Sequence, residues 1–234
     1  MKTVLITGAN GGLGKCLVKK YCSEGYQVFA FDYKLDEDSV RMEKEMDNLA
    51  LFSFIDVRDS NAIEKAWDLV AAKTDKIDIL INAAAILPAN SANVLEEFNI
   101  ESALDVYSTN ALGPLRVVQK FLPLIKNSKG KTIINISSEA GSISTHNDYI
   151  NRYDYCMSKA ALNMQSVILQ RYLRPEDIRV VVIHPGWMKT EMGGIDAPIP
   201  PENSADGIFD LAGTCGKDFE CGMFFDYDGC QRSW

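Results

Sequence analysis

Short apolar runs of strand length alternate with longer amphipathic stretches along most of this chain. The runs are TVLIT (3–7), QVFAF (27–31), ALFSFI (50–55), IDILIN (77–82), KTIINIS (131–137), IRVVVIH (178–184) and GMFFDY (222–227). Several of them are apolar at nearly every position, which is typical of central strands covered on both faces. The alternation predicts an α/β fold, a three-layer doubly wound parallel sheet of about seven strands.

The amphipathic stretches predict the helices between these strands. Apolar residues recur at helical spacing over 12–24, 60–72 and 155–173, and Gly25 is well placed to end the first of these helices. The chain has no internal repeat, no low-complexity tract and no Gly/Ser linker, and its one Pro-rich irregular stretch is 197–203. We therefore predict a single domain over residues 1–234.

Composition and charge narrow the range of partners. Of the 234 residues 47% are apolar, and 24 basic against 32 acidic residues give a net charge of −8. Because no basic stripe is present, neither nucleic acid nor an anionic membrane is an expected partner. The N-terminal MKTVLITGAN passes from a short apolar run into glycines, which indicates a first strand and not a signal peptide. No stretch approaches the roughly 20 apolar residues of a membrane span, so we expect a cytoplasmic protein.

The cysteines and histidines do not suggest a metal site. Six cysteines, at positions 16, 22, 156, 215, 221 and 230, form no C-x-x-C pair, and the two histidines are not spaced to complete a ligand set. We expect reduced thiols and no metal. Cys156 lies beside a candidate catalytic residue, and we favour packing over redox chemistry for it.

A glycine-rich turn follows the first predicted strand and opens the first predicted helix. It spans Thr7 to Gly14 with the sequence TGANGGLG. Glycines let the backbone approach a pyrophosphate, and unpaired N–H groups at a helix start favour its negative charge. The strand-turn-helix setting of this G-x-x-x-G-x-G spacing predicts a dinucleotide site. The candidate cofactor-binding residues in it are Gly8, Asn10, Gly11, Gly12, Leu13 and Gly14.

Asp32 follows the second predicted strand and bears on the choice of cofactor. A carboxylate at this place can accept hydrogen bonds from the adenosine ribose hydroxyls and would repel a 2′-phosphate. No Arg or Lys lies inside the glycine-rich turn, so NAD(H) is the preferred cofactor, with Tyr33 as a further candidate contact. Lys34 lies two residues beyond Asp32 and could reach a phosphate, so NADP(H) is not excluded.

Tyr155 and Lys159 form the second candidate constellation. A spacing of four residues puts them on one face of the predicted 155–173 helix. A phenol with a pKa near 10 is a poor acid-base catalyst at neutral pH unless a nearby cation stabilises its phenolate. Lys159 could supply that cation and could also hold the ribose of a cofactor.

These residues together resemble the classical short-chain dehydrogenase/reductase family over essentially the whole chain. The resemblance implies a Rossmann-type fold and an oxidoreductase that moves a hydride between the nicotinamide and a carbonyl or alcohol. It assigns adenine contacts to Asp56 and Val57. The family motif N-N-A-G corresponds here to 82–85, with Asn82, Ala83 and Ala84 as candidate contacts and with its second Asn and its Gly replaced. The contacts implied after the sixth strand are Pro185, Gly186, Met188 and Thr190.

The catalytic set that the resemblance implies is Asn110, Ser138, Tyr155 and Lys159. Tyr155 would donate a proton to the carbonyl oxygen, Ser138 would hydrogen-bond that oxygen, and Lys159 would lower the tyrosine pKa. The family's helix is distorted at the Asn, where a water links the Lys to solvent. Pro114 has no N–H to donate to the carbonyl of Asn110, so we expect it to help create this distortion.

The interval 139–154, the segment HPGWMKTEMGG and the ending FFDYDG…W resemble the sniffer-type carbonyl reductases and C-factor-like proteins. The interval, with His146, Asn147, Asp148 and Tyr149, either overhangs the substrate side or is a solvated loop. Residues 187–203 predict a short substrate-side loop, with Trp187 on the pocket side and an open pocket. His184 is expected to be a packed strand-end residue.

Two other functions compete with this one. Extended sugar-nucleotide epimerases also use Tyr-x-x-x-Lys, but usually carry T-G-x-x-G-x-x-G and a further substrate domain. A non-catalytic NAD-sensing or developmental signalling protein on the same fold is the second alternative, and absent turnover would favour it. The resemblance also implies a homodimer or homotetramer formed through helices that begin near Glu96 and Tyr155. The substrate, taken as a small carbonyl or alcohol, and the reaction direction stay open.

Overall fold

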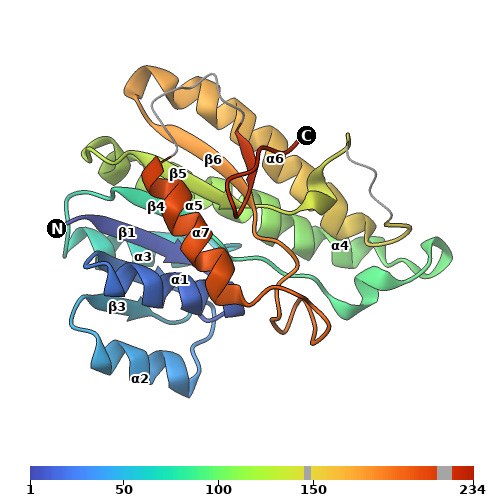
Figure 1. The fold of residues 1–234 in the computed structure, drawn as a ribbon, viewed down its shortest axis with the longest axis horizontal. Helices are drawn as coiled ribbons and strands as arrows, with labels where there is room; N and C mark the ends of the chain where they lie inside the picture. Colours follow the sequence, from blue (N-terminus) through green and yellow to red (C-terminus); the bar gives the residue numbers. More distant parts are fainter. Residues whose placement is uncertain (145–148, 215–222) are drawn as a thin grey trace.

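The chain folds around one sheet of seven parallel strands, seen in a computed structural model that describes residues 1–144, 149–214 and 223–234. The strands are β1 (Thr3–Thr7), β2 (Gln27–Phe31), β3 (Leu49–Phe52), β4 (Ile79–Asn82), β5 (Thr132–Ile136), β6 (Arg179–His184) and β7 (Phe224–Asp226). Their order is β3-β2-β1-β4-β5-β6-β7. The predicted doubly wound parallel sheet is therefore confirmed (Figure 1).

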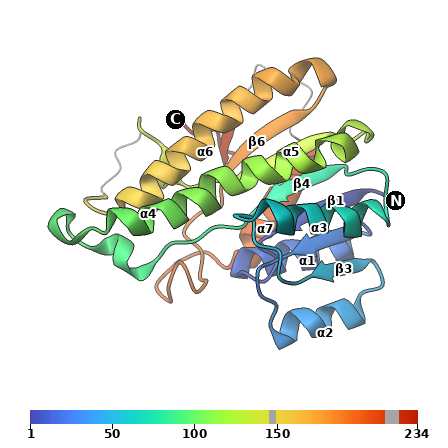
Figure 2. The same cartoon turned by 180° about the vertical axis from the view of Figure 1, so that it is seen from behind.

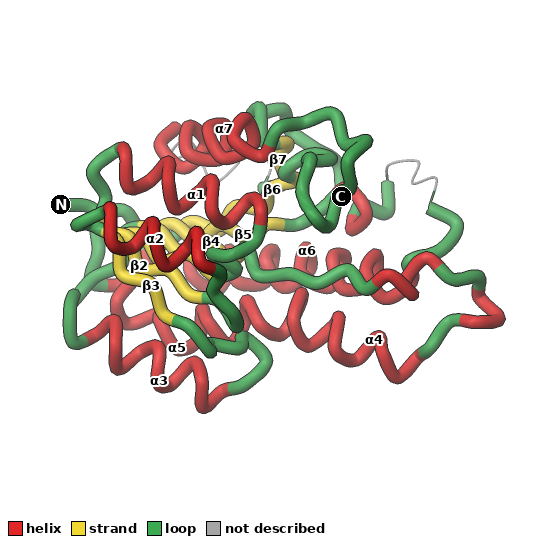
Figure 3. The backbone as a smooth tube through the Cα atoms, turned by 90° about the horizontal axis from the view of Figure 1, so that it is seen from below, coloured by secondary structure: helices red, strands yellow, loops and turns green. Residues whose placement is uncertain are grey.

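Helices cover both faces of the sheet. One face carries α1 (Gly12–Ser23), α2 (Glu37–Glu45) and α7 (Pro201–Thr214), and the other carries α3 (Ser60–Ala71), α4 (Ile100–Tyr107), α5 (Gly113–Lys126) and α6 (Tyr153–Leu173). Figure 3 shows the two helical layers with the strands between them, and Figure 2 shows α3, α5 and α6 on the near side of the sheet. Short one-turn elements fill the connections at 89–92, 95–97, 108–112, 139–141 and 174–176.

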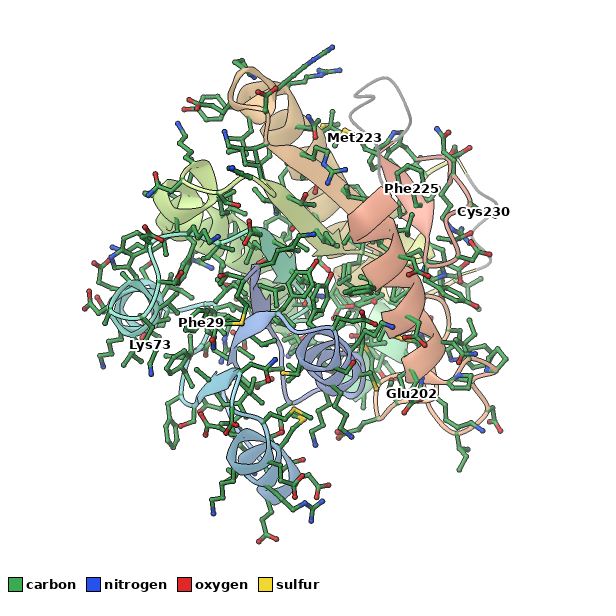
Figure 4. The ribbon with its side chains drawn as sticks, turned by 60° about the vertical axis from the view of Figure 1, so that its left-hand side comes forward. Phe29, Lys73, Glu202, Met223, Phe225 and Cys230 are labelled. Atoms are coloured by element: carbon green, nitrogen blue, oxygen red, sulfur yellow. The ribbon has the colours of Figure 1, made fainter. Side chains whose placement is uncertain are left out.

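The two apolar layers explain why the strands are apolar at nearly every position. Successive side chains of a strand point to opposite faces, so both registers of a central strand must be apolar. In β1, Val4 and Ile6 join one buried cluster and Leu5 joins the other. In β2, Val28 packs with the first cluster, whereas Phe29, marked in Figure 4, packs with the second.

Among the predicted boundaries that were wrong, three have a local explanation. β3 ends at Phe52, before the end of the predicted run, because Phe54 adopts a left-handed conformation with φ of 60° and leaves the sheet. α6 begins at Tyr153 instead of Tyr155; the Tyr153 ring packs edge-on against Phe98, with 5.5 Å between centroids. α7 begins at Pro201, inside the stretch predicted to be irregular, because proline suits the first turn of a helix.

The remaining helix predictions agree with the structure to within one residue: α1 and α3 each end one position earlier than expected. Among the described residues, no helix combines the length and apolar composition that crossing a bilayer would require. Since all seven strands are parallel, their carboxyl ends meet at one edge of the sheet, and the loops from that edge carry the candidate site.

Candidate active site

The glycine-rich turn connects β1 to α1 at the carboxyl edge of the sheet. Gly8 has φ of +71°, and a Cβ there would lie 2.6 Å from the backbone nitrogen of Ala84. Gly11 precedes the first turn of α1 without any side-chain cap, and the first helical backbone bond runs from Lys15 N to Gly11 O. The N–H groups of residues 12–14 are thus available to an anion, as the sequence predicted.

The loop after β6 crosses over this turn. A Cβ on Gly12 would lie 2.5 Å from Cγ2 of Thr190, so only glycine allows the two segments to approach this closely. Gly186, which follows β6, has φ of +80°. The backbone N–H of Thr190 donates to the carbonyl of Met188 at 2.9 Å, which closes the loop into a tight turn. The structure therefore brings the loop after β6, predicted to contact the nicotinamide half, against the glycine-rich turn.

Asp32 is attached to the glycine-rich turn directly. The backbone N–H of Asn10 donates to Asp32 Oδ2 at 2.9 Å, and the backbone N–H of Lys34 donates to Oδ1 at 3.3 Å. The Asn10 side chain continues the network, since its Oδ1 accepts a hydrogen bond from Ser39 Oγ at 2.6 Å. Tyr33, which follows Asp32, is exposed. The carboxylate is fixed at the mouth of the turn without a cationic side-chain partner among the described residues.

The predicted adenine and strand-four contacts lie beside the same edge. Arg58 forms an ion pair with Asp56 at 2.7 Å and lowers the pKa of that carboxyl. Thr7 Oγ1 accepts hydrogen bonds from the backbone N–H groups of Ala83 and Ala84, both at 3.2 Å, which fixes the chain after β4. Asn82 Nδ2 donates to Asn135 Oδ1 at 2.8 Å.

Asn82 has a buried side-chain oxygen, Oδ1, that meets no hydrogen-bond partner within the described residues. A buried acceptor without a partner carries a desolvation cost unless another group satisfies it. The oxygen lies on the end of β4 next to the glycine-rich turn, where a polar ligand would be expected. This feature and the uncapped start of α1 fit the nicotinamide dinucleotide that the sequence predicts.

Tyr155 and Lys159 occupy one face of α6, where Lys159 is buried and Tyr155 is half-buried. The Lys159 ammonium lies 5.6 Å from the centroid of the Tyr155 ring, and its Nζ donates to the carbonyl of Ile136 at 2.9 Å. Burial lowers the pKa of Lys159 to about 8. Burial also raises the pKa of Tyr155 to about 12, although a hydrogen bond with Ser138 works in the opposite direction. Desolvation is the larger effect in this net shift, and the lowering of the tyrosine pKa by Lys159 stays a prediction.

Ser138 follows β5 and faces the start of α6. Its backbone is extended, and its Oγ accepts a hydrogen bond from the backbone N–H of Ala140 at 3.2 Å. Ser138 is 8% exposed, so little solvent reaches the pair it forms with Tyr155. The structure thus brings together three members of the predicted catalytic set, Ser138, Tyr155 and Lys159.

Asn110 lies in a π-helical turn at 108–112 between α4 and α5. Its side chain is held on both sides: Oδ1 accepts from the backbone N–H of Ile86 at 2.8 Å, and Nδ2 donates to Ser158 Oγ at 3.1 Å. Pro114 occupies the first turn of α5 just after the π turn. The expected helix distortion at Asn110 is present, and π turns of this kind often accompany functional sites.

Two buried networks that support the site could not be found from sequence spacing. Asp154 accepts hydrogen bonds from Ser91 Oγ and from the backbone N–H of Tyr155, both at 2.7 Å. On the opposite side, Ser137 Oγ donates to Asn163 Oδ1 at 2.6 Å. The local sequence around Asp154 gives no indication of a partner 63 residues away.

Other predicted features fall partly outside the described residues. His146, Asn147 and Asp148 of the 139–154 interval lie there, as do Cys215 and Cys221. The described cysteines are free thiols, and burial raises the pKa of Cys156, which opposes thiolate chemistry. Among residues 1–144, 149–214 and 223–234 no group of three or more potential ligands could hold a metal ion.

Comparison with known proteins agrees with the fold and the site described above. The family model for short chain dehydrogenases matches residues 2–197. The C-signal protein of Myxococcus xanthus is 35% identical over 161 residues, which cover 69% of this chain and 95% of that protein.

Solved structures match over the whole chain. The NADPH-bound carbonyl reductase from chicken fatty liver superposes with a TM-score of 0.90 at 29% identity, covering 100% of this chain and 99% of that one. The carbonyl reductase Sniffer of D. melanogaster superposes with a TM-score of 0.88 at 32% identity, covering 100% of both chains. The resemblance to the sniffer-type and C-factor-like proteins, first drawn from motifs, is confirmed.

Proposed function

Since the chain belongs to the short chain dehydrogenase family, we propose that it transfers a hydride between a nicotinamide dinucleotide and a carbonyl or alcohol, with Tyr155 as general acid and base. The observation that carries the proposal is the close grouping of Tyr155 with the buried residues Lys159 and Ser138. This grouping lies at the edge of the sheet where the glycine-rich turn and the loop after β6 meet. The structural similarity to two carbonyl reductases supports reduction of a carbonyl as the reaction.

The proposed roles follow from the chemistry of each group. When bound, the nicotinamide supplies or accepts the hydride. Tyr155 transfers its phenolic proton to the carbonyl oxygen in reduction, and this transfer is favourable even at a pKa of about 12 because the developing alkoxide is a stronger base than a phenolate. Ser138 donates a hydrogen bond to the same oxygen. The Lys159 ammonium stabilises the tyrosinate that forms, and Asn110 holds the π turn through Ile86 and Ser158.

The Tyr155→Phe variant tests the acid-base role. It removes the hydroxyl and keeps the ring, so the fold and cofactor binding should persist. Acid-base assistance typically contributes about 10² to 10⁴ in rate, and turnover of a responsive carbonyl should fall by at least about 10². Turnover within a few-fold of the unchanged enzyme would exclude Tyr155 as the proton donor.

The preference between NAD(H) and NADP(H) rests on opposing observations. The Asp32 carboxylate is fixed at the mouth of the glycine-rich turn, where it would repel a 2′-phosphate, and on this ground we propose NAD(H). The chicken carbonyl reductase binds NADPH, which supports NADP(H) for this chain as well. The NAD(H) preference therefore draws no support from the comparisons, and Lys34 is the residue that would serve the phosphate.

Fluorescence titration with NADH and NADPH, for the unchanged protein and for Asp32→Ala and Lys34→Ala, separates the two cofactors. Tighter NADH binding that weakens in Asp32→Ala supports the ribose role of Asp32. Preferential NADPH binding that weakens in Lys34→Ala refutes the NAD(H) proposal and assigns the phosphate to Lys34. The hydride-transfer proposal is unaffected by either result.

The loop 187–203 is proposed to border the substrate. Trp187 is 54% exposed, yet its indole N–H donates to the carbonyl of Gly193 at 2.7 Å, so the ring is oriented. An isolated bridge between Met188 and Ile199 closes the base of the loop. An oriented but exposed ring suits an open pocket for a small carbonyl or alcohol.

We propose the cytoplasm as the place where the enzyme works. We also propose self-association through α4 and α6, as the sequence suggested. These helices expose large apolar side chains that a partner copy could cover, namely Leu104, Tyr107, Met164, Ile168 and Tyr172. Light scattering that shows a monomer at micromolar concentration would exclude this part of the proposal.

A second candidate is a non-catalytic dinucleotide-sensing or signalling protein, favoured by the similarity to a relative named C-signal. Cofactor binding without turnover over a broad panel of aldehydes, ketones and quinones would support it against the enzyme.

A further inference from the structure

His184, the last residue of β6, holds the peptide that follows Ser138. The backbone N–H of Glu139 donates to Nδ1 of His184 at 3.1 Å. The contact extends the pairing of β5 with β6, in which the Ser137 N–H donates to the carbonyl of Ile183 at 2.8 Å. Because Nδ1 accepts a hydrogen bond, it carries no proton, and the neutral ring must carry its proton on Nε2.

The imidazole is buried among charged groups from four segments. Its side chain is 10% exposed, and Nε2 lies 3.9 Å from Oε2 of Glu139. Arg232 contacts that same carboxylate at 3.5 Å and pairs with Asp226 of β7. Lys159 of α6 also acts electrostatically on the ring. Burial is the main reason that the pKa of His184 is lowered; Arg232 and Lys159 lower it further, while Glu139 and Asp226 oppose them.

The segment after Ser138 also forms hydrogen bonds with the residues that follow β7. Ser142 Oγ donates to the carbonyl of Ser233 at 2.9 Å, and the Ser144 N–H donates to the carbonyl of Trp234 at 2.7 Å. The Trp234 ring stacks on Phe224 with 5.3 Å between centroids. Ser138 therefore lies between β5, which is paired with β6, and a segment hydrogen-bonded to the residues after β7. The Glu139–His184 hydrogen bond involves the residue next to Ser138.

We propose that His184 is a positioning residue for Ser138: its neutral imidazole holds the Glu139 N–H and so fixes the backbone from which the Ser138 hydroxyl meets the substrate carbonyl. This inference rests on the proposed hydride-transfer function. Protonation of Nδ1 would place its N–H opposite the N–H of Glu139, so that the hydrogen bond is lost and the Ser138–Glu139 peptide is released. The inference thus gives His184 a part in turnover that is lost at acid pH, beyond the packing role expected from sequence.

Two substitutions separate this role from simple packing. His184→Leu fills the space but offers no acceptor, whereas the side-chain oxygen of His184→Asn can replace Nδ1 and does not titrate. Loss of one positioning hydrogen bond corresponds to about tenfold in rate, so kcat should fall about tenfold in His184→Leu and stay within about threefold in His184→Asn. Cofactor affinity should be unchanged in both.

The pH profile supplies the readout that packing alone would not move. In the unchanged enzyme kcat should decline on the acid side as His184 gains a proton, and in His184→Asn this decline should disappear. Normal kcat in His184→Leu, or the same acid decline in His184→Asn, would overturn the inference. If His184→Leu fails to fold, the comparison of His184→Asn with the unchanged enzyme still decides it.

Nitrogen NMR tests the hydrogen bond without any substrate. The chain contains two histidines, so a His146→Gln variant assigns both rings. We expect His184 to be neutral at pH 7 with its proton on Nε2; a proton on Nδ1 would refute the inference whether or not the enzyme turns over. Conversely, if NMR shows the expected ring while no carbonyl is reduced with either cofactor, the hydride-transfer proposal fails, and with it the role of His184 in turnover.

Discussion

Gly8 and Gly25 offer a matched pair for testing how closely the glycine-rich turn must approach the chain after β4. Both have positive φ, +71° and +75°. A Cβ on Gly8 would lie 2.6 Å from Ala84 N and 2.7 Å from Ala84 Cα, whereas a Cβ on Gly25 would meet nothing within 4 Å. The atoms opposed to Gly8 are backbone atoms that Thr7 Oγ1 holds in place, so they cannot move aside.

The magnitudes follow from these contacts. An alanine in the left-handed region costs roughly 1–2 kcal/mol, partly offset by about 0.4–1 kcal/mol because the unfolded chain loses entropy. Gly25→Ala should therefore destabilise the protein by about 1 kcal/mol. Gly8→Ala adds an overpacking cost of roughly 1–3 kcal/mol, for a total of about 2–4 kcal/mol. At about 2–4 °C per kcal/mol for a chain of this length, Gly8→Ala should lower Tm by roughly 5–15 °C.

Thermal unfolding and NADH and NADPH titration of both variants form the assay. Gly8→Ala should also weaken binding of the preferred cofactor by more than about tenfold, because the turn must shift away from the phosphates. Gly25→Ala should leave the affinity unchanged, since it lies at the far end of α1. Equal Tm values for the two variants, together with unchanged affinity in Gly8→Ala, would refute the argument that close backbone approach requires glycine at position 8.

Three further predictions concern the supports of the site. Lys159→Met should raise the free energy of unfolding at pH 7 while abolishing turnover, because the lowered pKa of about 8 marks a buried ammonium that costs stability. Between about pH 8 and the usual lysine pKa of 10.5 the native state binds fewer protons than the unfolded state, so the stability of the unchanged protein rises and the advantage of the variant should shrink. An advantage independent of pH would contradict this. Asp154→Ala should destabilise the fold by about 1–3 kcal/mol by leaving Ser91 Oγ and the Tyr155 N–H without their acceptor; unchanged denaturant unfolding would count against that network. Pro114→Ala gives position 114 an N–H for the carbonyl of Asn110 and should relax the π turn and slow turnover. A crystal structure of this variant with the same bend and an ordered water at Asn110, together with normal turnover, would disprove the role of Pro114.

The local sequence pattern predicted the seven strands, three of the seven α-helices named above and the glycine-rich turn, and it put Tyr155 and Lys159 on one helix face. These features depend on local patterns: apolar strand positions, helical spacing, and glycines placed between a strand and a helix. The gathering of the candidate residues at one edge of the sheet is seen in the structure, where parallel strands bring their carboxyl ends together. The catalytic set itself came from resemblance to a family, and the roles of its members stay predictions.

The tertiary structure decided what depends on partners distant in sequence. The Ser91–Asp154 hydrogen bond joins residues 63 positions apart, and the Glu139–His184 hydrogen bond joins residues 45 apart. No local spacing encodes such contacts, since each forms only when separate strands and helices pack. The same holds for the raised pKa of Tyr155 and the lowered pKa of Lys159: both come from burial, and burial is a property of the packed layers around α6 and not of the Tyr-x-x-x-Lys spacing.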